Sequence, residues 1–466
     1  MMPIIDMLLK HAKKERLSLH MPGHKAGMLF SADHNFLNEE YTSFLKSLSE
    51  IARYDLTELI GIDSLHNPKN AILKAMELTA EVYGAASSFF LVNGSTCGVH
   101  AMVYSSFRRG DTVLVTSDCH MSVFNALMVL GCRVVIVPVE VDKSTLIPLS
   151  VAPKKVEEAY REFPHAKGII LPRPNYYGVC ADLKSIADIV HSKEGVVLVD
   201  EAHGGHFGFS SKVPDRALSL GADMCVQSAH KTLQSINQGA YLHIADKKYE
   251  KKVFKALKVI ETTSPSFLVL ATLDFTREYM RNVSRERLNG LSNAVNEFTK
   301  DLEKYELYHV FDGSGYEKDI TRLVINCNGK GAKLAKMLAD KGIYCEMYNH
   351  NNVVFILTCA DDKGSLDILY EGLTSEDLYG SLQGVEEIQS LNHKNTIRDI
   401  NLFDFDFYMN AESVSMEVKE AVGKVSSQFV IPYPPGIPVI FPGERVTKFH
   451  ADICQSYCIE MINVIK

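Results

Sequence analysis

Between about residues 70 and 250 the chain alternates short apolar runs, each long enough for one strand, with amphipathic stretches of helical period. This alternation predicts an α/β fold with a mostly parallel sheet that helices cover on both faces, because each strand must return across the sheet before the next begins. Ligands of such sheets bind beyond the carboxyl ends of the strands, so the residues that follow each apolar run are the first candidates for a site. The expected strands are 88–92, 112–115, 133–139, 168–171, 196–199 and 224–226, and the expected helices include 71–83, 99–107, 123–130 and 183–192.

Beyond residue 250 the rhythm changes, and longer helices precede a second mixture of strands and helices. We expect one long helix at 268–304 to connect the large domain to a smaller α+β domain. The other elements expected there are helices 251–260 and 332–341 and strands 321–326 and 353–358. The pattern divides the chain into an N-terminal segment (1–60), a large domain (61–300), a small α+β domain (301–395) and a C-terminal domain (396–466).

The composition is that of an ordinary soluble protein: 466 residues, of which 46% are hydrophobic and 23% charged, with room for roughly two or three domains. A formal net charge of −8 gives no electrostatic reason to expect a nucleic acid or an anionic membrane as partner. No apolar run approaches the ~18 residues of a membrane helix, and residues 1–10 do not resemble a signal peptide. Ten cysteines stand without a C-x-x-C pair, so we expect reduced thiols in a cytoplasmic protein.

Lys231 stands soon after the apolar run Met224–Val226, in the sequence Gln-Ser-Ala-His-Lys. A lysine at the end of a buried strand is poorly hydrated, and desolvation lowers the pKa of an amine, as a Schiff-base nucleophile requires. Asp200 ends the apolar run Val196–Val199. An acid that keeps a pyridine nitrogen protonated, with a lysine that carries the aldehyde, is what a pyridoxal phosphate (PLP) site needs. The two strand ends therefore predict a PLP enzyme.

The turn Gly94-Ser95-Thr96 lies between an expected strand and an expected helix. Free N–H groups, the helix dipole and two hydroxyls favour a phosphate there. Taken alone, an ordinary helix N-cap explains the turn better, and the presence of Asp200 and Lys231 reverses that preference. His120 lies past another strand end, where an imidazole could stack on a pyridine ring. Lone histidines are usually structural, so this interpretation depends on its companions.

The segment Asp200–His206 contains two acids and two histidines, and it superficially resembles a metal cluster. A divalent cation needs three or four converging ligands. A strand end directs successive side chains to opposite faces, and Gly204-Gly205 suits a close approach of the backbone. We therefore expect no metal.

Glu444, Asp55 and Glu58 are acids in non-helical settings. A basic substrate side chain needs at least one desolvated carboxylate as its partner, and these three are the candidates. Each of them could equally be a turn or rim residue. The prolines of 431–438 predict a stiff, defined loop close to Glu444.

Seven segments resemble those of the prokaryotic ornithine/lysine/arginine decarboxylases, which have the PLP fold type I (aspartate aminotransferase-like) large domain. The segments occur in the order of that family and span residues 20 to 444. The chain is similar to the short, biosynthetic arginine decarboxylase form, without the N-terminal wing domain of the large acid-induced enzymes. It departs from the family pattern at Met121, Asn175 and Asn237, which leaves the substrate open. The segments are His20–Lys25, Asn93–Thr96, Cys119–Ser122, Asp200–His206, Ser228–Lys231, Tyr433–Pro438 and Pro442–Glu444.

The resemblance implies a role for most of these residues. Lys231 would hold PLP, Asp200 would pair with the pyridine nitrogen, and His120 would stack on the ring. Family members are dimers or larger assemblies with active sites at subunit interfaces. The segment with Thr262 and Ser264 resembles the one that reaches the cofactor phosphate of the neighbouring subunit. The remaining cofactor contacts would come from Gly94, Ser95, Thr96, Ala202, His203, Ser228 and His230.

The implied function is PLP-dependent decarboxylation of a basic amino acid, with arginine to agmatine favoured, in polyamine biosynthesis, and lysine or ornithine as alternatives. Cα would regain its proton from Lys231 or a nearby histidine. A second hypothesis is an aminotransferase or lyase of the same fold. An aminotransferase needs an arginine for the α-carboxylate, and Arg322 and Arg445 are candidates. A third is a regulator with this fold, against which the set of His120, Asp200 and Lys231 argues.

Overall fold

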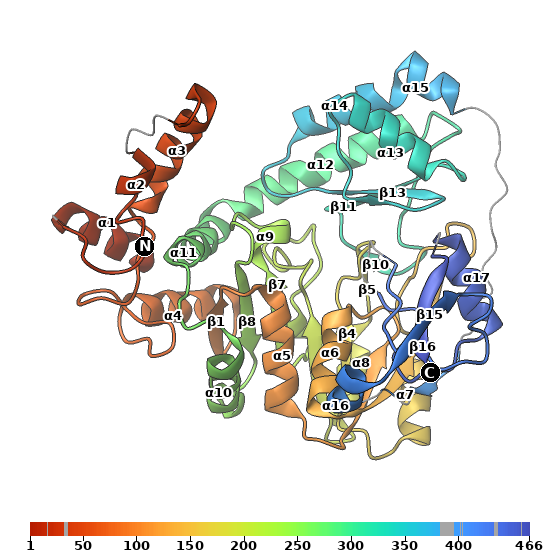
Figure 1. The fold of residues 1–466 in the computed structure, drawn as a ribbon. Coiled ribbons are helices and arrows are strands. Elements are labelled where there is room, and N and C mark those ends of the chain that lie inside the picture. The colour runs from red at the N-terminus through yellow and green to blue at the C-terminus, as the bar shows by residue number, and fades with distance from the viewer. Residues whose placement is uncertain are drawn as a thin grey trace.

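The structure, a computed structural model, describes residues 1–15, 17–31, 36–382, 396–400, 402, 404–432, 437–457 and 459–466. Its centre is an eight-stranded sheet between layers of helices (Figure 1). The strand order is β1-β8-β7-β6-β4-β2-β3-β14, and the five strands from β7 to β3 run parallel, which confirms the predicted α/β fold. The strands are β1 Ser87–Leu91, β2 Thr112–Thr116, β3 Arg133–Val137, β4 Gly168–Pro172, β6 Val196–Asp200, β7 Met224–Ser228, β8 Ala240–Ile244 and β14 Arg398–Ile400.

Successive residues of the strands face two apolar layers, as the strand period requires. In β2, Val113 and Val115 pack into one layer and Leu114 into the other. Because both faces are covered, the central strands are apolar at consecutive positions, such as Val113–Val115 in β2, which is why they are readable from the sequence. One layer contains α5 Gly94–Ser106, α6 Met121–Leu130 and α10 Glu250–Ile260, and the other contains α7 Pro153–Glu162 and α8 Leu183–His191.

A four-stranded antiparallel sheet forms the core of a second body, above the large sheet in Figure 1. The prediction of one helix over 268–304 is wrong, because the chain forms α11 Phe267–Asn282 and α12 Ser284–Leu302. At the β-branched Val283 between them, φ is −121°, well outside the helical range. The elements after α12 are β9 His309–Val310, β11 Arg322–Asn326, α13 Gly331–Asp340, β12 Met347–Tyr348, β13 Asn352–Ile356, α14 Lys363–Thr374 and α15 Glu376–Ser381.

The C-terminal residues form a two-stranded antiparallel ribbon and two helices. Before them, β14 pairs antiparallel with β3 and becomes an edge strand of the central sheet. This part has an apolar cluster of its own, with Val418, Ile440 and Cys454 among its buried members. The elements are α16 Phe405–Asn410, β15 Ser413–Glu417, α17 Lys448–Ser456 and β16 Met461–Ile465.

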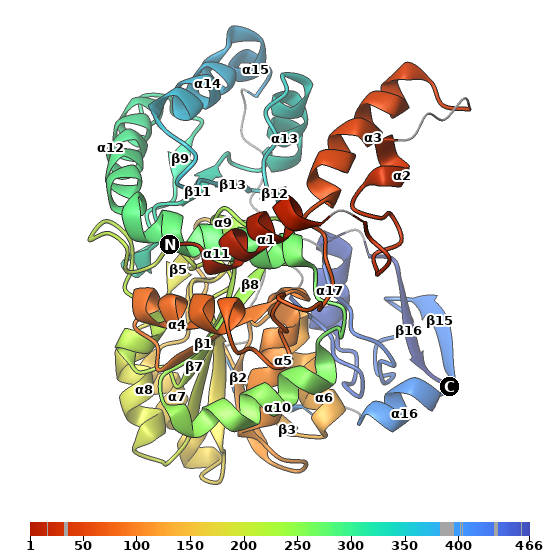
Figure 2. The ribbon, with the colours of Figure 1, turned by 90° about the vertical axis from the view of Figure 1, so that its left-hand side faces the viewer.

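The N-terminal segment begins with α1 Pro3–Lys14, which packs on α4 Ala71–Tyr83 and α11. From there α2 Met28–Ser31 and α3 Glu39–Ala52 project away from the main body, as Figures 1 and 2 both show. Neither these helices nor any other in the described parts of the chain is both long and apolar enough to cross a membrane.

Candidate active site

The sequence-predicted residues gather where several strands end at the same edge of the central sheet. β6 ends at Asp200 and β7 at Ser228, and these two strands are parallel neighbours. β2 also runs parallel to them and leads into His120 at the start of α6. β1 points the same way because two antiparallel pairings separate it from β7, so Gly94 follows it at the same edge. The topology thus unites four sequence segments that are far apart along the chain.

Lys231 lies in α9 (Ala229–Thr232), the short helix that begins directly after β7. Its Nζ atom is 3.2 Å from His203 Nε2. Burial is the largest effect on the pKa of Lys231 and lowers it; the charge of Asp200 raises it, and Arg322 lowers it further. The site therefore favours the neutral amine, which is the nucleophilic form.

His203 connects Lys231 to Arg322. Arg322 Nη2 approaches His203 Nδ1 within hydrogen-bonding distance. A guanidinium can only donate, so Nδ1 must accept, and the ring proton of the neutral imidazole is on Nε2. Nε2–H then donates to the lone pair of Lys231 Nζ. Burial, with Lys231 and Arg322 as further causes, holds the pKa of His203 well below its ordinary value, in agreement with a neutral ring.

Arg322 is the first residue of β11 and is fully buried. Its Nε and Nη1 atoms have no hydrogen-bond partner among the described residues. Unpaired buried N–H groups are costly, and a charged guanidinium N–H is a strong donor to a carboxylate. Of the two sequence candidates for a carboxylate-binding arginine, the structure brings Arg322 to the site. It does not bring Arg445, whose exposed side chain donates to the carbonyl oxygen of Gly423.

Asp200 and His120 complete the central group. Asp200 is 8% exposed, and its Oδ1 accepts a hydrogen bond of 3.1 Å from the N–H of Ala202. His120 Nδ1 accepts from the N–H of Ser122 at 3.2 Å, which places the proton of a neutral ring on Nε2. Burial lowers the pKa of His120, the nearby charge of Asp200 raises it, and Lys231 lowers it. His120, Asp200 and Lys231 therefore lie within one electrostatic environment.

The first turn of α5 forms a place for a phosphate. α5 begins at Gly94, earlier than predicted, so Ser95 and Thr96 belong to its first turn and their N–H groups lie at the positive end of the helix dipole. Gly94 has φ +76°, a left-handed conformation that favours glycine. Ser228 Oγ donates to Ser95 Oγ at 2.7 Å, which brings the end of β7 against this turn. His230 Nδ1 lies 3.1 Å from the carbonyl oxygen of Gly239, so its Nδ1–H donates there.

The residues present fit PLP. A buried amine, an acid at a neighbouring strand end and a helix N-terminus with two hydroxyls supply the three kinds of contact that the cofactor requires. The unpaired N–H groups of Arg322 leave donors for a carboxylate in the same place. The residues of this site can therefore hold PLP and an amino acid at the same time.

The Asp200–His206 segment does not form one ligand cluster. Glu201 is fully buried, accepting from the side chain of Gln227 at 2.7 Å and from the N–H of Ala217 at 2.8 Å. His206 Nε2 lies 3.0 Å from Asp319 Oδ1 in a second buried network. These residues support the strand end from behind, while Asp200 and His203 face Lys231.

The three substrate acids are not gathered at the strand ends. Asp55 pairs with His24 at 3.2 Å within the N-terminal segment, and Glu58 is exposed on the same segment. Glu444 forms a 2.6 Å ion pair with Arg398, and burial raises its pKa while Arg398 lowers it. Glu444 lines a cavity of about 900 Å³ that extends to Asp118, two residues before His120. Tyr433–Gly436 of the proline-rich loop lie outside the described residues.

Sequence reasoning missed one contributor, Tyr176, and one contact, that of Asn93. The ring of Tyr176 packs against that of His203, with the centroids 4.9 Å apart at 67°. Tyr176 follows the end of β4, so the same strand-end signal could have found it. Asn93 accepts a 3.1 Å hydrogen bond from the N–H of Thr262, which ties the segment of Thr262 and Ser264 to the turn before α5 within one chain. This tertiary contact has no local sequence signal.

Comparisons with known proteins identify the family of the chain. The model of the Orn/Lys/Arg decarboxylase major domain matches residues 2–318, and that of the C-terminal domain matches residues 405–463. The uncharacterized protein YaaO of Bacillus subtilis is 34% identical over 96% of this chain and 92% of its own length. The arginine decarboxylase of the same organism is 32% identical over 96% of this chain and 91% of its own length.

Solved structures share the fold. The Francisella novicida lysine decarboxylase LdcF superposes with a TM-score of 0.84 over 100% of this chain and 81% of its own, at 17% identity. The E. coli constitutive lysine decarboxylase gives 0.82 over 100% and 82%, also at 17% identity. A serine palmitoyltransferase structure described as "SPT with PLP" matches 66% of this chain and 77% of its own, with a TM-score of 0.55 at 14% identity. With its strand-end lysine, acid and phosphate turn, the chain belongs to the Orn/Lys/Arg decarboxylase family of PLP-dependent enzymes.

Proposed function

We propose that the protein removes the α-carboxyl group of L-arginine, with PLP as cofactor, to give agmatine and CO2 for polyamine synthesis. The observation that carries the proposal is the chain of contacts Arg322–His203–Lys231 beside Asp200. The choice of arginine is supported by relatives named arginine decarboxylase, which are 28–32% identical over nearly the whole chain. Lysine is the second candidate, because the E. coli constitutive lysine decarboxylase is 22% identical.

Lys231, Asp200 and the first turn of α5 would hold the cofactor. Burial lowers the pKa of Lys231, Asp200 raises it and Arg322 lowers it, so the net shift is toward the neutral amine. The carboxylate of Asp200 would keep a proton at the ring nitrogen, and the N–H groups of Ser95 and Thr96 would receive the phosphate. When bound, PLP supplies an electron sink for the electron pair that remains on Cα after CO2 leaves.

Arg322 and His203 would orient the amino acid and manage its protons. The unpaired Nε–H or Nη1–H of Arg322 would donate to the α-carboxylate, which sets the direction of the bond that breaks. Burial of the Arg322 guanidinium keeps water away from the carboxylate. After CO2 leaves, Cα needs one proton, and Lys231 or the Nε2–H of His203 can deliver it, because these two groups lie 3.2 Å apart.

Among the acids, Glu444 is the best-supported partner for the substrate guanidinium. It is the one of the three that is buried for the most part and lines the large cavity. A guanidinium that replaced Arg398 would keep the same ion pair. Asp55 and Glu58 remain the alternatives.

We also propose a homodimer in the cytoplasm. Ser264 is exposed beside the phosphate turn, a position from which it and Thr262 could reach the cofactor phosphate of a second copy. The projecting N-terminal segment exposes Leu19, Met21 and Phe44, between 67% and 82% of each, and a second copy would cover them. The nine described cysteines are free thiols, as a reducing compartment requires.

The test is release of CO2 from L-arginine, L-lysine and L-ornithine in parallel, with identification of the amine products. We expect agmatine as the main product. Lys231→Ala should abolish turnover, while Lys248→Ala, a change of an exposed lysine, should not. Formation of a keto acid instead of CO2, or silence on all three substrates with PLP bound, would overturn the proposal.

A further inference from the structure

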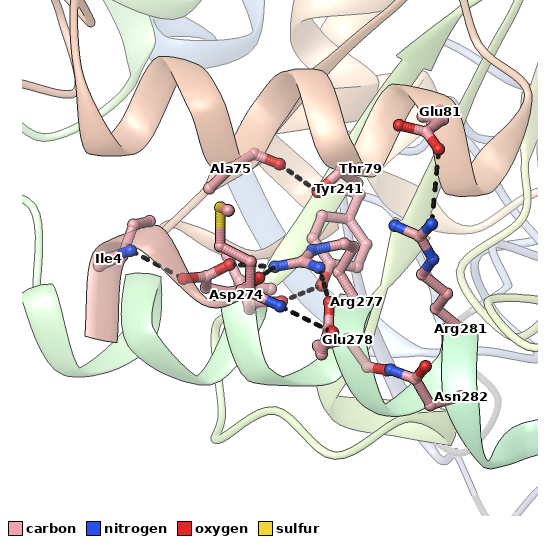
Figure 3. Close-up of polar contacts among 12 residues, drawn as sticks. Ile4, Ala75, Thr79, Glu81, Tyr241, Asp274, Arg277, Glu278, Arg281 and Asn282 are labelled. Carbon is pink, nitrogen blue, oxygen red and sulfur yellow. Dashed lines mark hydrogen bonds and ion pairs between the residues drawn. The ribbon is translucent and has the colours of Figure 1, made fainter. Parts of the chain in front are cut away.

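The helix α1 is held in place by a buried ion pair of α11 (Figure 3). Asp274 Oδ1 binds Arg277 at 2.6 Å, and both side chains are fully buried. Asp274 Oδ2 accepts from the N–H of Ile4 at 2.8 Å, and Arg277 donates to the carbonyl oxygen of Met1 at 2.6 Å. The start of α1 is therefore fixed, and its last turn carries His11 to a defined position.

The end of α1 forms a cluster of two histidines and one acid. His11 and Glu15 are four residues apart, one helical turn along the same face. The chain then returns, so that His20 Nε2 lies 2.8 Å from Glu15 Oε1, while His11 Nε2 lies 3.5 Å from Glu15 Oε2. The three ligand atoms all lie within 4.8 Å of one another. Among the described residues, this is the one group of three or more such side chains that is so compact.

The hydrogen bonds of the two rings point to a missing cation. His20 Nδ1 lies 2.5 Å from the carbonyl oxygen of Met21, so Nδ1 carries a proton and donates it. In the neutral ring, Nε2 is then a lone pair that faces the lone pairs of Glu15 Oε1. His11 Nε2 is buried and has no hydrogen-bond partner among the described residues. A positive charge between these three atoms removes both conflicts.

We propose that His11 Nε2, the Glu15 carboxylate and His20 Nε2 bind one divalent metal ion of the zinc class. Tetrahedral ligands at about 2.0–2.1 Å from Zn²⁺ stand about 3.3 Å from one another, close to the separations from Glu15 to the two rings. The contact of His20 with the Met21 carbonyl is the kind that orients a metal-binding imidazole. Two imidazoles with one carboxylate favour Zn²⁺, Co²⁺ or Ni²⁺ over Mg²⁺ and Ca²⁺, which prefer oxygen ligands.

A fourth ligand has a place in the same region. Ser18 Oγ lies 3.3 Å from His20 Nε2. Glu15 also lines a cavity of about 400 Å³ together with Ser18, which leaves room for a water. Lys25 and Arg53 line that cavity too, so its lining does not attract cations by negative charge alone. The two ring nitrogens, rather than an acidic surface, would select the metal, and the ion would tie the end of α1 to the segment 17–27.

The test uses the full-length, PLP-loaded protein after dialysis against a chelator, with ZnCl₂ titrated by calorimetry and CoCl₂ by visible absorption. We expect one equivalent of tightly bound metal and the intense d–d bands of four-coordinate Co²⁺. His11→Ala, His20→Ala and Glu15→Gln should each weaken binding at least about tenfold. The matched control His165→Ala, which changes an exposed histidine, should bind as the wild type does. These readouts do not depend on decarboxylase activity.

Two outcomes would overturn the proposal. If the wild type takes up no more metal than His20→Ala, the positive charge at Glu15 is a proton on an imidazolium. If wild-type protein shows only the weak bands of six-coordinate Co²⁺, the three side chains do not bind the ion together. The second readout needs no variant, so a variant that folds poorly does not weaken the test.

Discussion

At the scale of single residues, the site is defined by proton positions. Arg322 fixes the acceptor nitrogen of His203, so the other nitrogen must donate to Lys231. A donated hydrogen bond requires a lone pair on Lys231, which agrees with the lowered pKa of this amine. One arginine thus lowers the pKa of a lysine that it does not contact in the described hydrogen bonds.

A buried histidine behind the site makes stability depend on pH. Burial, with Arg216 as a second cause, lowers the pKa of His243 to about 3. In the unfolded chain this histidine binds a proton near pH 6.5, whereas in the folded chain it stays neutral. Its contribution to the free energy of unfolding is therefore fully present above pH 6.5 and is lost as the pH decreases. Between pH 7 and 5 the loss is about 2 kcal/mol.

Urea unfolding of the wild type and of His243→Gln at pH 7 and pH 5 measures this effect. The variant should lose about 2 kcal/mol less than the wild type over that interval. Burial raises the pKa of Glu261 to about 7 and has the opposite effect on stability, but both proteins share it. Equal pH dependence in the two proteins would mean that His243 is protonated in the folded state.

At the scale of secondary-structure elements, the two serines at the phosphate turn join α5 to β7. Ser95 and Ser228 are hydrogen-bonded to each other at 2.7 Å, so each orients the other. The sequence indicated the turn but not this contact, because the two residues are 133 positions apart. The contact makes the helix N-terminus and the lysine-bearing strand one unit.

Ser95→Ala and Ser228→Ala should each weaken PLP binding about tenfold, since the first removes a hydroxyl that can donate to the phosphate and the second removes the donor that orients that hydroxyl. The double variant should lose less than the product of the two, because the first change already disturbs the partner. Equilibrium dialysis of PLP measures all three. Ser106→Ala, at the other end of α5, is the matched control and should bind PLP normally. Strictly multiplicative losses would contradict the coupling.

The junction of α1 with α11 depends on one acid. Asp274→Ala should destabilise the protein by about 3 kcal/mol, because it leaves the buried Arg277 without one carboxylate and the N–H of Ile4 without its acceptor. Arg281→Ala breaks the exposed 3.7 Å pair with Glu81, also visible in Figure 3, and should cost less than about 1 kcal/mol. Urea unfolding compares the two, and similar losses would show that burial does not matter here.

At the scale of the whole molecule, the site is completed by the second body. β11 of the small antiparallel sheet carries Arg322 to the strand ends of the large sheet. The two bodies therefore share one site, and a change in their relative position changes the charge that Lys231 experiences.

Removing the positive charge of Arg322 should change the pKa of Lys231 in a definite direction. Arg322→Met should raise the pKa of Lys231. The pH at which half of the protein carries PLP bonded to Lys231 should therefore be higher than in the wild type. The KM for arginine should rise as well if the guanidinium binds the α-carboxylate. A pH titration of the visible cofactor spectrum measures the first effect, with Arg445→Met as the control. An unchanged midpoint would mean that Arg322 does not act on Lys231.

The sequence predicted what is encoded locally. Asp200 and Lys231 stand beside apolar runs that indicate buried strands. The burial of these two residues and their position at the same edge of the sheet could therefore be predicted. Arg322 and Arg445 were equal candidates, because no local pattern tells which arginine is carried across to another body. The break at Val283 and the pairing of β14 with β3 were likewise decided by tertiary packing.

β14 also protects the central sheet against aggregation at high protein concentration. Without residues 398–400, the backbone N–H and C=O groups of β3 would form an open edge of a largely apolar strand, which is a template for aggregation. Arg133 at the start of β3 donates to the carboxylate of Asp399 through Nε and Nη2, and this ion pair fixes the register of β14. The C-terminal residues thus act as a built-in guard against self-association of the sheet.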